Sequence, residues 1–325
     1  MGVKILSTGS YFPERILTNN DLEKMVDTTD EWITTRTGIK ERRIADDKTS
    51  TSTLAIKATQ NALKETKIDL KDIDLIIVAT ATPDMLFPST ACFVQNGLGI
   101  TNCTCFDIYA ACSGFIYGLS CARNLIETGE FKTAIVVGAE TLSKITNWND
   151  RNTCVLFGDG AGSIILQYSE TENSILSIHL GADGRYGNLL MMPAGGSKYP
   201  ATRETIEKKM HYIHMEGKEV FKLAVVKMVE SVIKALEICN KNIDDITLLI
   251  PHQANIRIID TMAEKLNFPR EKIFVNLHKY GNISAASTIA ALDEARKQGR
   301  IKPGDLVEIV AFGSGFTWGA AVIKI

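Results

Sequence analysis

The sequence lacks the features that mark exported, membrane-bound or nucleic-acid-binding proteins. Its first residues, MGVKILSTGSYFPERI, contain no apolar signal-peptide stretch, and Leu6 stands where a myristoylation motif has Ser or Thr. The longest apolar runs, at 75–81 and 133–139, have the length of buried strands and are far too short to span a membrane. Thirty-six basic residues nearly balance 38 acidic ones. We therefore expect a cytoplasmic protein whose partners include no membrane and no nucleic acid.

The patterns of cysteine that disulfides and metal sites need are also missing. The seven cysteines form an odd set in a chain without an export signal, which predicts reduced thiols. Cys103 and Cys105 are too closely spaced for a C-x-x-C motif, and no histidine lies between Cys105 and Cys154. We expect no metal site, so each thiol needs its own explanation.

What the sequence does contain is an alternation of buried strands and longer helices. Apolar, β-branched runs predict strands at 76–81, 105–110, 133–140 and 161–167, and helical patterns occupy 89–97, a stretch from about 112, and 221–239. This alternation is typical of an α/β fold. The Gly-rich segment 181–200 is the best candidate for an irregular loop. With 325 residues, the chain is long enough for two domains or one large duplicated domain.

An internal repeat favours duplication. Residues 61–82 align without a gap on 234–255 and share seven identical positions, among them Asp72/Asp245 and Leu75/Leu248. A second match, ETGEF at 127–131 with KQGRI at 297–301, sets an offset of 170 that places Cys112 opposite Asn282. Shared amphipathic patterning alone can produce such matches, so coincidence stays open. If the repeat is real, ligands are expected where strand ends of the two halves meet.

Cys112 is the candidate nucleophile. It follows the apolar run FDIYAA, lies among small residues and precedes an amphipathic helix. The free N–H groups at a helix N-terminus favour thiolate over thiol, which predicts a lowered pKa and a sulfur able to attack an acyl carbonyl. The alternative is a buried structural cysteine, the default for the other six.

Two polar residues are candidate partners of this thiol. His252 follows the apolar run ITLLIP. The repeat has Ala79 at this position, so a titratable side chain replaces a small apolar one at a strand end. Asn282 follows a glycine in KYGNISAAS, before a predicted helix. The alternatives are a hydrogen-bonded structural histidine and a helix-capping asparagine. The pairing of Asn282 with Cys112 in the repeat favours function.

A Gly-Ser-Gly turn at 313–315 separates two predicted strands in IVAFGSGFTWGAAV. Such a turn can bring backbone N–H groups close to a reacting oxygen, although most turns of this kind simply join a hairpin.

Taken together and in this order, AACSGF, PHQAN-x-R, YGNISAAS and FGSGFTWG resemble the β-ketoacyl-acyl carrier protein synthase III family, and TTDEWITTRTGIKERR at 28–43 is similar to it as well. The resemblance spans nearly the whole chain. It implies a thiolase-like five-layered αβαβα fold of two duplicated halves, here 1–170 and 171–325, and a homodimer.

The resemblance also implies a reaction. A short acyl-CoA, most simply acetyl-CoA, is joined to malonyl-acyl carrier protein with release of CoA and carbon dioxide, which initiates type II fatty acid biosynthesis. Cys112 would carry the acyl group, the backbone N–H groups of Cys112 and Ser314 would hold the oxyanion, and His252 with Asn282 would donate to the enolate left by decarboxylation. No cofactor and no metal is implied.

Further contacts follow from the resemblance alone. Phe87 would reach into the partner subunit's acyl pocket. Residues that would bind CoA are Trp32, Arg36, Arg151, Gly217 and Asn255. Residues that would dock the acidic carrier protein are Lys222, Gln253, Ala254, Asn255, Ile256, Arg257 and Lys265.

The turn departs from the family in one place, because many members have three glycines where this chain has Gly-Ser-Gly; its geometry could shift if Ser314 needs a positive φ. Elongating synthases use two histidines, and chalcone-synthase-like enzymes lack the HQAN-x-R pattern, so both are disfavoured. Two alternatives remain: a starter-unit enzyme of a secondary-metabolite or signalling pathway, and a non-catalytic homologue that binds acyl-CoA or carrier protein.

Overall fold

The computed structural model describes residues 2–325, and most of its strands form two sheets. The first sheet has the order β1 (Gly2–Tyr11), β7 (Asp159–Ser169), β6 (Thr133–Thr141), β4 (Leu75–Ala79) and β5 (Thr104–Ile108). The second has the order β8 (Ile175–Ala182), β13 (Thr317–Lys324), β12 (Leu306–Gly313) and β11 (Leu248–Pro251). The strands predicted at 76–81, 105–110, 133–140 and 161–167 are confirmed within a few residues.

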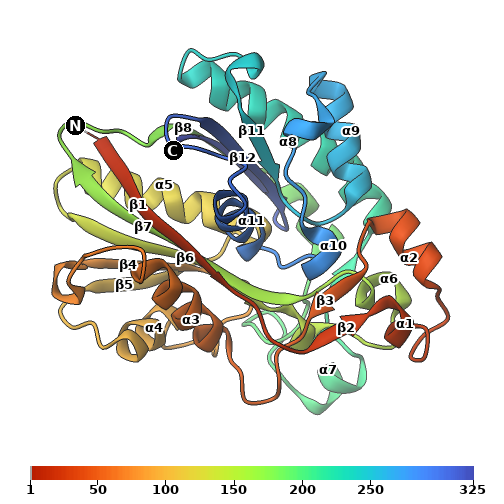
Figure 1. The fold of residues 1–325 in the computed structure, drawn as a ribbon. Coiled ribbons are helices and arrows are strands. Elements are labelled where there is room, and N and C mark those ends of the chain that lie inside the picture. Colours follow the sequence, from red (N-terminus) through yellow and green to blue (C-terminus); the bar gives the residue numbers. More distant parts are fainter. Residues whose placement is uncertain (1) are drawn as a thin grey trace.

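Helices form three layers around the two sheets (Figure 1). Helices α3 (Thr51–Leu63) and α4 (Thr90–Leu98) cover the outer face of the first sheet, and α8 (Gly217–Ile238) and α9 (Ile256–Leu266) cover that of the second. Helices α5 (Gly114–Glu127) and α11 (Ala286–Lys297) lie between the sheets. The five-layered αβαβα arrangement that the family resemblance implies is confirmed.

The two halves repeat one topology. In each sheet the corresponding central strand, β6 or β12, pairs in parallel with β4 or β11 and antiparallel with β7 or β13. The sequence repeat falls on matching units: α3, a 3₁₀ turn η1 (Leu70–Asp72) and β4 in one half, and α8, η5 (Ile243–Asp245) and β11 in the other. The last strand of the first sheet, β7, ends at Ser169, and the next strand, β8, belongs to the second sheet. This supports a boundary between the halves at 170/171, which stays a prediction.

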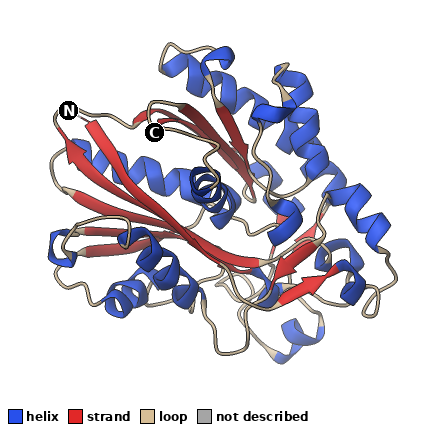
Figure 2. Cartoon of the chain, in the orientation of Figure 1, coloured by secondary structure: helices blue, strands red, loops and turns tan. Residues whose placement is uncertain are grey.

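Shorter elements complete the described chain (Figure 2). They are β2 (Ile16–Thr18), α1 (Asn19–Leu22), α2 (Asp30–Thr37), β3 (Glu41–Arg43), η2 (Ala111–Ser113), η3 (Leu142–Ile145), α6 (Arg151–Cys154), η4 (Gly184–Leu189), β9 (Leu190–Met191), α7 (Arg203–Glu207), β10 (His214–Met215), η6 (Arg270–Lys272) and α10 (Leu277–Tyr280). The predicted loop at 181–200 is confirmed as largely irregular, because it holds only the end of β8, a 3₁₀ segment and the two-residue β9.

Helix α11 is buried on nearly every side because both sheets pack against it. Its sequence, ASTIAALDEARK, consists largely of small and apolar residues, as expected for a helix enclosed in a core. Its one fully buried charge, Asp293, accepts hydrogen bonds from the hydroxyls of Thr8 (2.9 Å) and Ser10 (2.5 Å) and pairs with Lys297. Small residues also allow close backbone approach, since a Cβ on Gly138 would lie 2.3 Å from the carbonyl oxygen of Ala285. The first sheet therefore lies directly against the start of α11.

Candidate active site

Cys112 lies in the 3₁₀ turn η2, immediately before α5. The preceding residue, Ala111, has a φ of +45°, a left-handed conformation that non-glycine residues rarely adopt. The backbone of the Gly-Ser-Gly turn packs on the other side, since a Cβ on Gly313 would lie 2.6 Å from the Cys112 nitrogen. Cys112 is thus held between a strained turn of the first half and the end of β12 in the second.

His252 follows β11 directly, and it is nearly buried. Its backbone N–H donates to the carbonyl oxygen of Val310 (2.7 Å), which ties it to β12. Its ring Nδ1 lies 2.6 Å from the hydroxyl of Ser287 in α11. Because Nδ1 is engaged there, Nε2 is the ring nitrogen left for a reacting group.

Asn282 precedes α11 and is locked to the first half by its backbone. Its N–H donates to the carbonyl of Leu156 (2.8 Å), and its own carbonyl accepts from Gly158 (3.0 Å). Its side-chain Oδ1 accepts from the backbone N–H of Ser284 (2.9 Å). Since Oδ1 is occupied, the Nδ2 amide group is the end left to donate to another molecule.

The start of α11 links all three candidates. Ser284 is nearly buried and has a φ of +45°. The next residue, Ala285, lies against the segment of Cys112, since a Cβ on Gly114 would lie 3.6 Å from the Cβ of Ala285. The Ser284 backbone holds the Asn282 amide, and Ser287, one helical turn later, holds the His252 ring. The structure therefore brings the three predicted residues to one place, where both halves contribute.

The protonation states differ from one sequence-based expectation. Burial raises the pKa of Cys112 to about 12, although part of the residue is accessible. This direction is opposite to the prediction of a lowered pKa, because loss of hydration on burial is the largest cause. Burial lowers the pKa of His252 to about 4, so this imidazole is neutral at physiological pH.

Hydroxyl groups join the nucleophile turn to the Gly-Ser-Gly turn. The Ser113 hydroxyl donates to the carbonyl of Ala110 (2.8 Å) and lies 2.7 Å from the Thr317 hydroxyl. Thr317 in turn lies within hydrogen-bond distance of the carbonyls of Ala110 (2.9 Å) and Ser314 (3.1 Å). Within this turn the positive φ belongs to Gly315 (+134°) rather than to Ser314. The serine therefore fits without strain, and its side chain donates to the carbonyl of Leu190.

Three of the five predicted CoA contacts lie together near the surface. The guanidinium carbons of Arg151 and Arg36 lie 4.5 and 5.7 Å from the centre of the Trp32 ring. Arg151 is held there by its hydrogen bond to the carbonyl of Asp27 (2.8 Å). A flat indole face with two cations suits an aromatic base bearing phosphates.

The other two predicted CoA contacts lie at helix starts. Asn255 caps α9, which packs against α2, the helix that carries Trp32. Gly217 begins α8, which packs against α9. All five predicted contacts therefore lie on elements that adjoin one another.

The predicted carrier-protein surface is partly corrected. Lys222, Arg257 and Lys265 are exposed, and the Arg257 guanidinium lies 5.7 Å from the ring centre of Phe221, next to Lys222. Ala254 and Ile256 are half-buried, with Ile256 packed on the core. Gln253 is buried, and its amide donates to two carbonyls and accepts from the N–H of Asn276 (2.9 Å). The expectation that Gln253 touches the carrier protein is therefore wrong: it holds the 274–276 segment beside β11.

Phe87 stands apart from the other candidates. Its side chain is 84% exposed, and its neighbours Leu86 and Met85 are exposed as well. The segment precedes α4, which packs against the edge strand β5. An exposed apolar cluster of this kind is typical of a surface that another protein covers.

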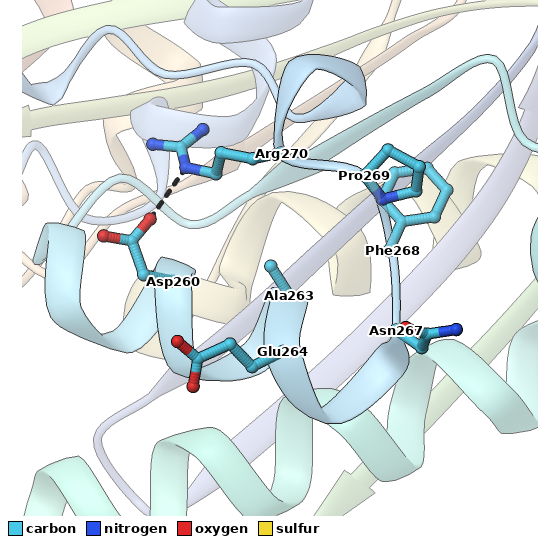
Figure 3. A pocket seen from close by; sticks show the side chains of 7 residues that line it. All are labelled: Asp260, Ala263, Glu264, Asn267, Phe268, Pro269 and Arg270. Atoms are coloured by element: carbon cyan, nitrogen blue, oxygen red, sulfur yellow. Dashed lines mark hydrogen bonds and ion pairs between the residues drawn. The ribbon is translucent and has the colours of Figure 1, made fainter.

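One surface pocket is lined by none of these residues. Figure 3 shows it at the end of α9, where Arg270 and Asp260 form an ion pair (2.7 Å). Its residues are Asp260, Ala263, Glu264, Asn267, Phe268, Pro269 and Arg270. Because it contains none of the candidate site residues, we assign it no part in the chemistry.

Over residues 2–325, no cluster of three His, Cys, Asp or Glu side chains could hold a metal ion, and no helix is both long and apolar enough to cross a membrane.

Sequence reasoning missed the supporting residues Ser284, Ser287, Thr317 and Glu140. The first two are spaced three residues apart after Asn282, the spacing of one helix face. Glu140 is the one acidic residue of the apolar run TAIVVGAE, and an acid at the end of an otherwise apolar strand is the sequence signal that points to it.

Comparison with known proteins gives one consistent family. The family described as 3-oxoacyl-[acyl-carrier-protein] synthase III matches residues 106–184, and its C-terminal counterpart matches 227–325. The β-ketoacyl-[acyl-carrier-protein] synthase III of Caldanaerobacter subterraneus is 58% identical over 98% of this chain and 97% of its own.

Two solved structures also resemble the chain. The 3-oxoacyl-[acyl-carrier-protein] synthase III of Aquifex aeolicus has a TM-score of 0.92 and 49% identity, with full coverage of both chains. The priming β-ketosynthase of the R1128 polyketide pathway has a TM-score of 0.92 and 32% identity, covering 100% of this chain and 96% of its own.

Proposed function

The chain belongs to the 3-oxoacyl-[acyl-carrier-protein] synthase III family of condensing acyltransferases, and we propose that Cys112, His252 and Asn282 perform its decarboxylative condensation. The substrates are a short acyl-CoA, most simply acetyl-CoA, and malonyl-acyl carrier protein, and the reaction initiates fatty acid synthesis. The observation that carries this assignment of residues is the start of α11, where Ala285 lies against the segment that follows Cys112, Ser287 contacts His252 and Asn282 precedes both.

In the first half-reaction, the Cys112 sulfur attacks the thioester carbonyl of acyl-CoA. Negative charge builds on the carbonyl oxygen, and the backbone N–H groups of Cys112 and Ser314 stabilise it. The close approach of Gly313 to the Cys112 nitrogen supports this pairing of donors. CoA leaves as a thiolate, and the acyl group stays on Cys112.

In the second half-reaction, malonyl-acyl carrier protein loses carbon dioxide and becomes an enolate. A neutral His252 with its proton on Nε2 donates to the enolate oxygen, while Nδ1 accepts from Ser287. The Asn282 amide supplies the second donor through Nδ2. The enolate carbon then attacks the acyl carbonyl on Cys112, which forms the new carbon–carbon bond.

The binding surfaces follow from the same proposal. Trp32, Arg36 and Arg151 receive the adenine and phosphates of CoA, with Asn255 and Gly217 along the pantetheine arm. The acidic carrier protein docks on Lys222, Arg257 and Lys265, near Ala254 and Ile256.

We also propose a cytoplasmic homodimer in which Phe87 enters the partner's acyl pocket. Its 84% exposure, beside Leu86 and Met85, supports a second copy as the covering surface. Seven free thiols support a reducing compartment.

Intact-protein mass spectrometry tests the assignment. Incubation with acetyl-CoA adds one acetyl mass to the wild type, Cys112→Ala abolishes the addition, and Asn282→Ala keeps it. A wild-type protein that stays unmodified refutes the first half-reaction and favours a non-catalytic homologue.

The starter-unit alternative is supported by the similarity to the priming β-ketosynthase, whose 32% identity is lower than the 58% of the β-ketoacyl-[acyl-carrier-protein] synthase III of Caldanaerobacter subterraneus. Steady-state rates with malonyl-acyl carrier protein and with malonyl-CoA separate the two functions. We expect strong preference for the carrier protein, and equal use favours the alternative. The same assay with acetyl-, isobutyryl- and octanoyl-CoA defines the primer.

A further inference from the structure

The first residue of β13, Thr317, carries a hydroxyl group that reaches both turns of the active site. Its Oγ1 lies 2.9 Å from the carbonyl oxygen of Ala110, two residues before Cys112, and 3.1 Å from that of Ser314. It also lies 2.7 Å from the hydroxyl of Ser113, the residue after Cys112. One side chain of the second half is therefore within hydrogen-bond distance of both turns. None of the steps described above uses it.

The sheet and the side-chain shape hold this hydroxyl in place. Thr317 pairs with Gly313 of β12 and with Ala182 of β8, so its backbone is fixed on both sides. Threonine is branched at Cβ, which restricts rotation about χ1. Its methyl group packs beside Gly315, where an added Cβ would lie 3.0 Å from Thr317 Cγ2. The second sheet therefore determines where the hydroxyl lies.

The two turns carry the N–H groups that are proposed to stabilise the oxyanion. Among the turn and loop hydrogen bonds of residues 2–325, neither the N–H of Cys112 nor that of Ser314 donates to a backbone carbonyl. Both are therefore available to a substrate oxygen. One belongs to η2 in the first half and the other to the turn after β12, about 200 residues later. Contacts between the two turns, rather than the local backbone, must fix the spacing of the two donors.

These contacts limit the separation of the turns in both directions. The backbone at Gly313 meets the Cys112 nitrogen so closely that an added Cβ would lie 2.6 Å from it, which prevents a closer approach. Hydrogen bonds oppose a wider one. The Ser113 hydroxyl donates to Ala110 (2.8 Å), which leaves the Thr317 proton for the carbonyl of Ser314. The contact between the two hydroxyls then joins the turns.

We propose that Thr317 is a positioning residue that fixes the spacing of the two oxyanion donors, the N–H groups of Cys112 and Ser314. Negative charge develops on an acyl oxygen twice: when Cys112 attacks acyl-CoA, and when the enolate carbon attacks the acyl group on Cys112. Both steps need the two donors at hydrogen-bond distance from the same oxygen. Loss of carbon dioxide puts its charge on the malonyl thioester oxygen, which His252 and Asn282 stabilise in the proposed mechanism. The inference rests on the proposed function, because it concerns the same oxyanion site.

The variant Thr317→Val tests the inference, because valine keeps the branched shape and replaces the hydroxyl by a methyl group. In the full-length enzyme, single-turnover acetylation of Cys112 at saturating acetyl-CoA should fall about 10-fold, less than the ~100- to 1,000-fold typical of losing an oxyanion donor outright. The acetyl-CoA concentration that gives half the maximal rate should change less than about twofold, since only the transition state loses a contact. Release of labelled carbon dioxide from malonyl-acyl carrier protein should keep its wild-type rate.

Two further variants serve as controls. Thr317→Ser keeps the hydroxyl and should restore most of the acetylation rate. Thr59→Val is the matched control, because Thr59 is fully buried in α3 and its hydroxyl donates to that of Ser163 in β7 (3.1 Å), on the outer face of the first sheet. It should leave acetylation and carbon dioxide release unchanged.

A Thr317→Val enzyme that is acetylated at the wild-type rate overturns the inference. An equal fall in acetylation and in carbon dioxide release overturns it as well, because a general disturbance of the fold has that effect, and so does a Thr317→Ser enzyme as slow as Thr317→Val. If Thr317→Val does not fold, Ser113→Ala decides, since it removes the second hydroxyl between the turns and should slow acetylation alone. A wild type that takes up no acetyl refutes the proposed function itself, whereas the inference alone fails only in variants of an active enzyme.

Discussion

Replacing Ser287 by alanine removes the hydroxyl that holds the His252 ring. This hydrogen bond is short, at 2.6 Å from Nδ1, and Ser287 is 1% exposed. In the proposed mechanism Nδ1 accepts this bond from the Ser287 hydroxyl, which holds the proton of the neutral ring on Nε2, where the enolate forms. The substitution therefore changes which nitrogen carries the proton while Cys112 and its surroundings stay in place.

The size of the expected rate effect follows from His252 Nδ1, the buried ring nitrogen that Ser287→Ala leaves without a hydrogen-bond partner. A buried polar atom that loses its partner is destabilised by about 1 to 3 kcal/mol. With a tenfold change for every ~1.4 kcal/mol, the Nε2–H form becomes about 5- to 150-fold less favoured relative to the other tautomer. We expect the rate of malonyl-acyl carrier protein decarboxylation to fall within that range. Removing an oxyanion donor outright lowers kcat by about 100- to 1,000-fold, which is the upper limit for losing the His252 contribution.

The assay separates the two half-reactions in one preparation. Release of labelled carbon dioxide from malonyl-acyl carrier protein reports the step that His252 supports, and acetyl transfer to Cys112 reports the step that it does not. Ser287→Ala should slow the first and leave the second within about twofold of wild type. Ser231→Ala is the control, since its hydroxyl is equally buried but bonds within α8, to the carbonyl of Lys227. A Ser287→Ala enzyme whose two steps fall equally, or not at all, refutes this role of the hydrogen bond.

Three further outcomes are expected. Trp32→Ala should raise KM for acetyl-CoA about 5- to 30-fold, because about 1 to 2 kcal/mol of stacking and cation–π contact is lost, while kcat changes little. An unaltered KM in initial-rate measurements contradicts the CoA site. Arg257→Glu should raise KM for malonyl-acyl carrier protein about tenfold, most at low salt, while acetylation of Cys112 by acetyl-CoA is unaffected. If both reactions slow equally, Arg257 is not part of the carrier-protein surface. Glu308→Met should stabilise the fold, since both carboxyl oxygens of Glu308 are buried without a hydrogen-bond partner within the described chain. Burial raises the pKa of Glu308 well above its usual value. The stability of the wild type should therefore fall as pH rises from the usual pKa of a glutamate toward the raised pKa of Glu308, because only the unfolded chain ionises there. The variant should not show this decrease, and thermal unfolding at about pH 5 and pH 8 measures the difference.

The sequence predicted the elements of the site better than its electrostatics. Motifs and the internal repeat identified Cys112, His252 and Asn282, because strand ends and helix starts leave short local patterns. The pKa of Cys112 could not be read in the same way. Its helix N-terminus is visible in the sequence, whereas the burial that raises its pKa involves segments about 200 residues away, such as Gly313.

Gln253 shows a second limit of sequence reasoning. A polar residue in the loop after β11 suggests an exposed contact, but its amide hydrogen-bonds the backbone of 274–276 and so is buried. Glu140 was overlooked for a related reason, since a single acid at the end of an apolar strand resembles the start of a surface turn. Only the convergence of β4, β6 and α11 shows that this strand end lies inside the protein.

The central position of α11 has a consequence for how the chain is made. The ribosome completes the first sheet and Cys112 long before it adds α11, the helix between the two sheets. Until then the inner face of the first sheet has no covering helix from the second half, and the His252 ring lacks the Ser287 hydroxyl. Catalytic competence therefore requires the late-made helix α11, and a chain released before residue 282 would carry Cys112 without Asn282 or the helix that packs between the two sheets.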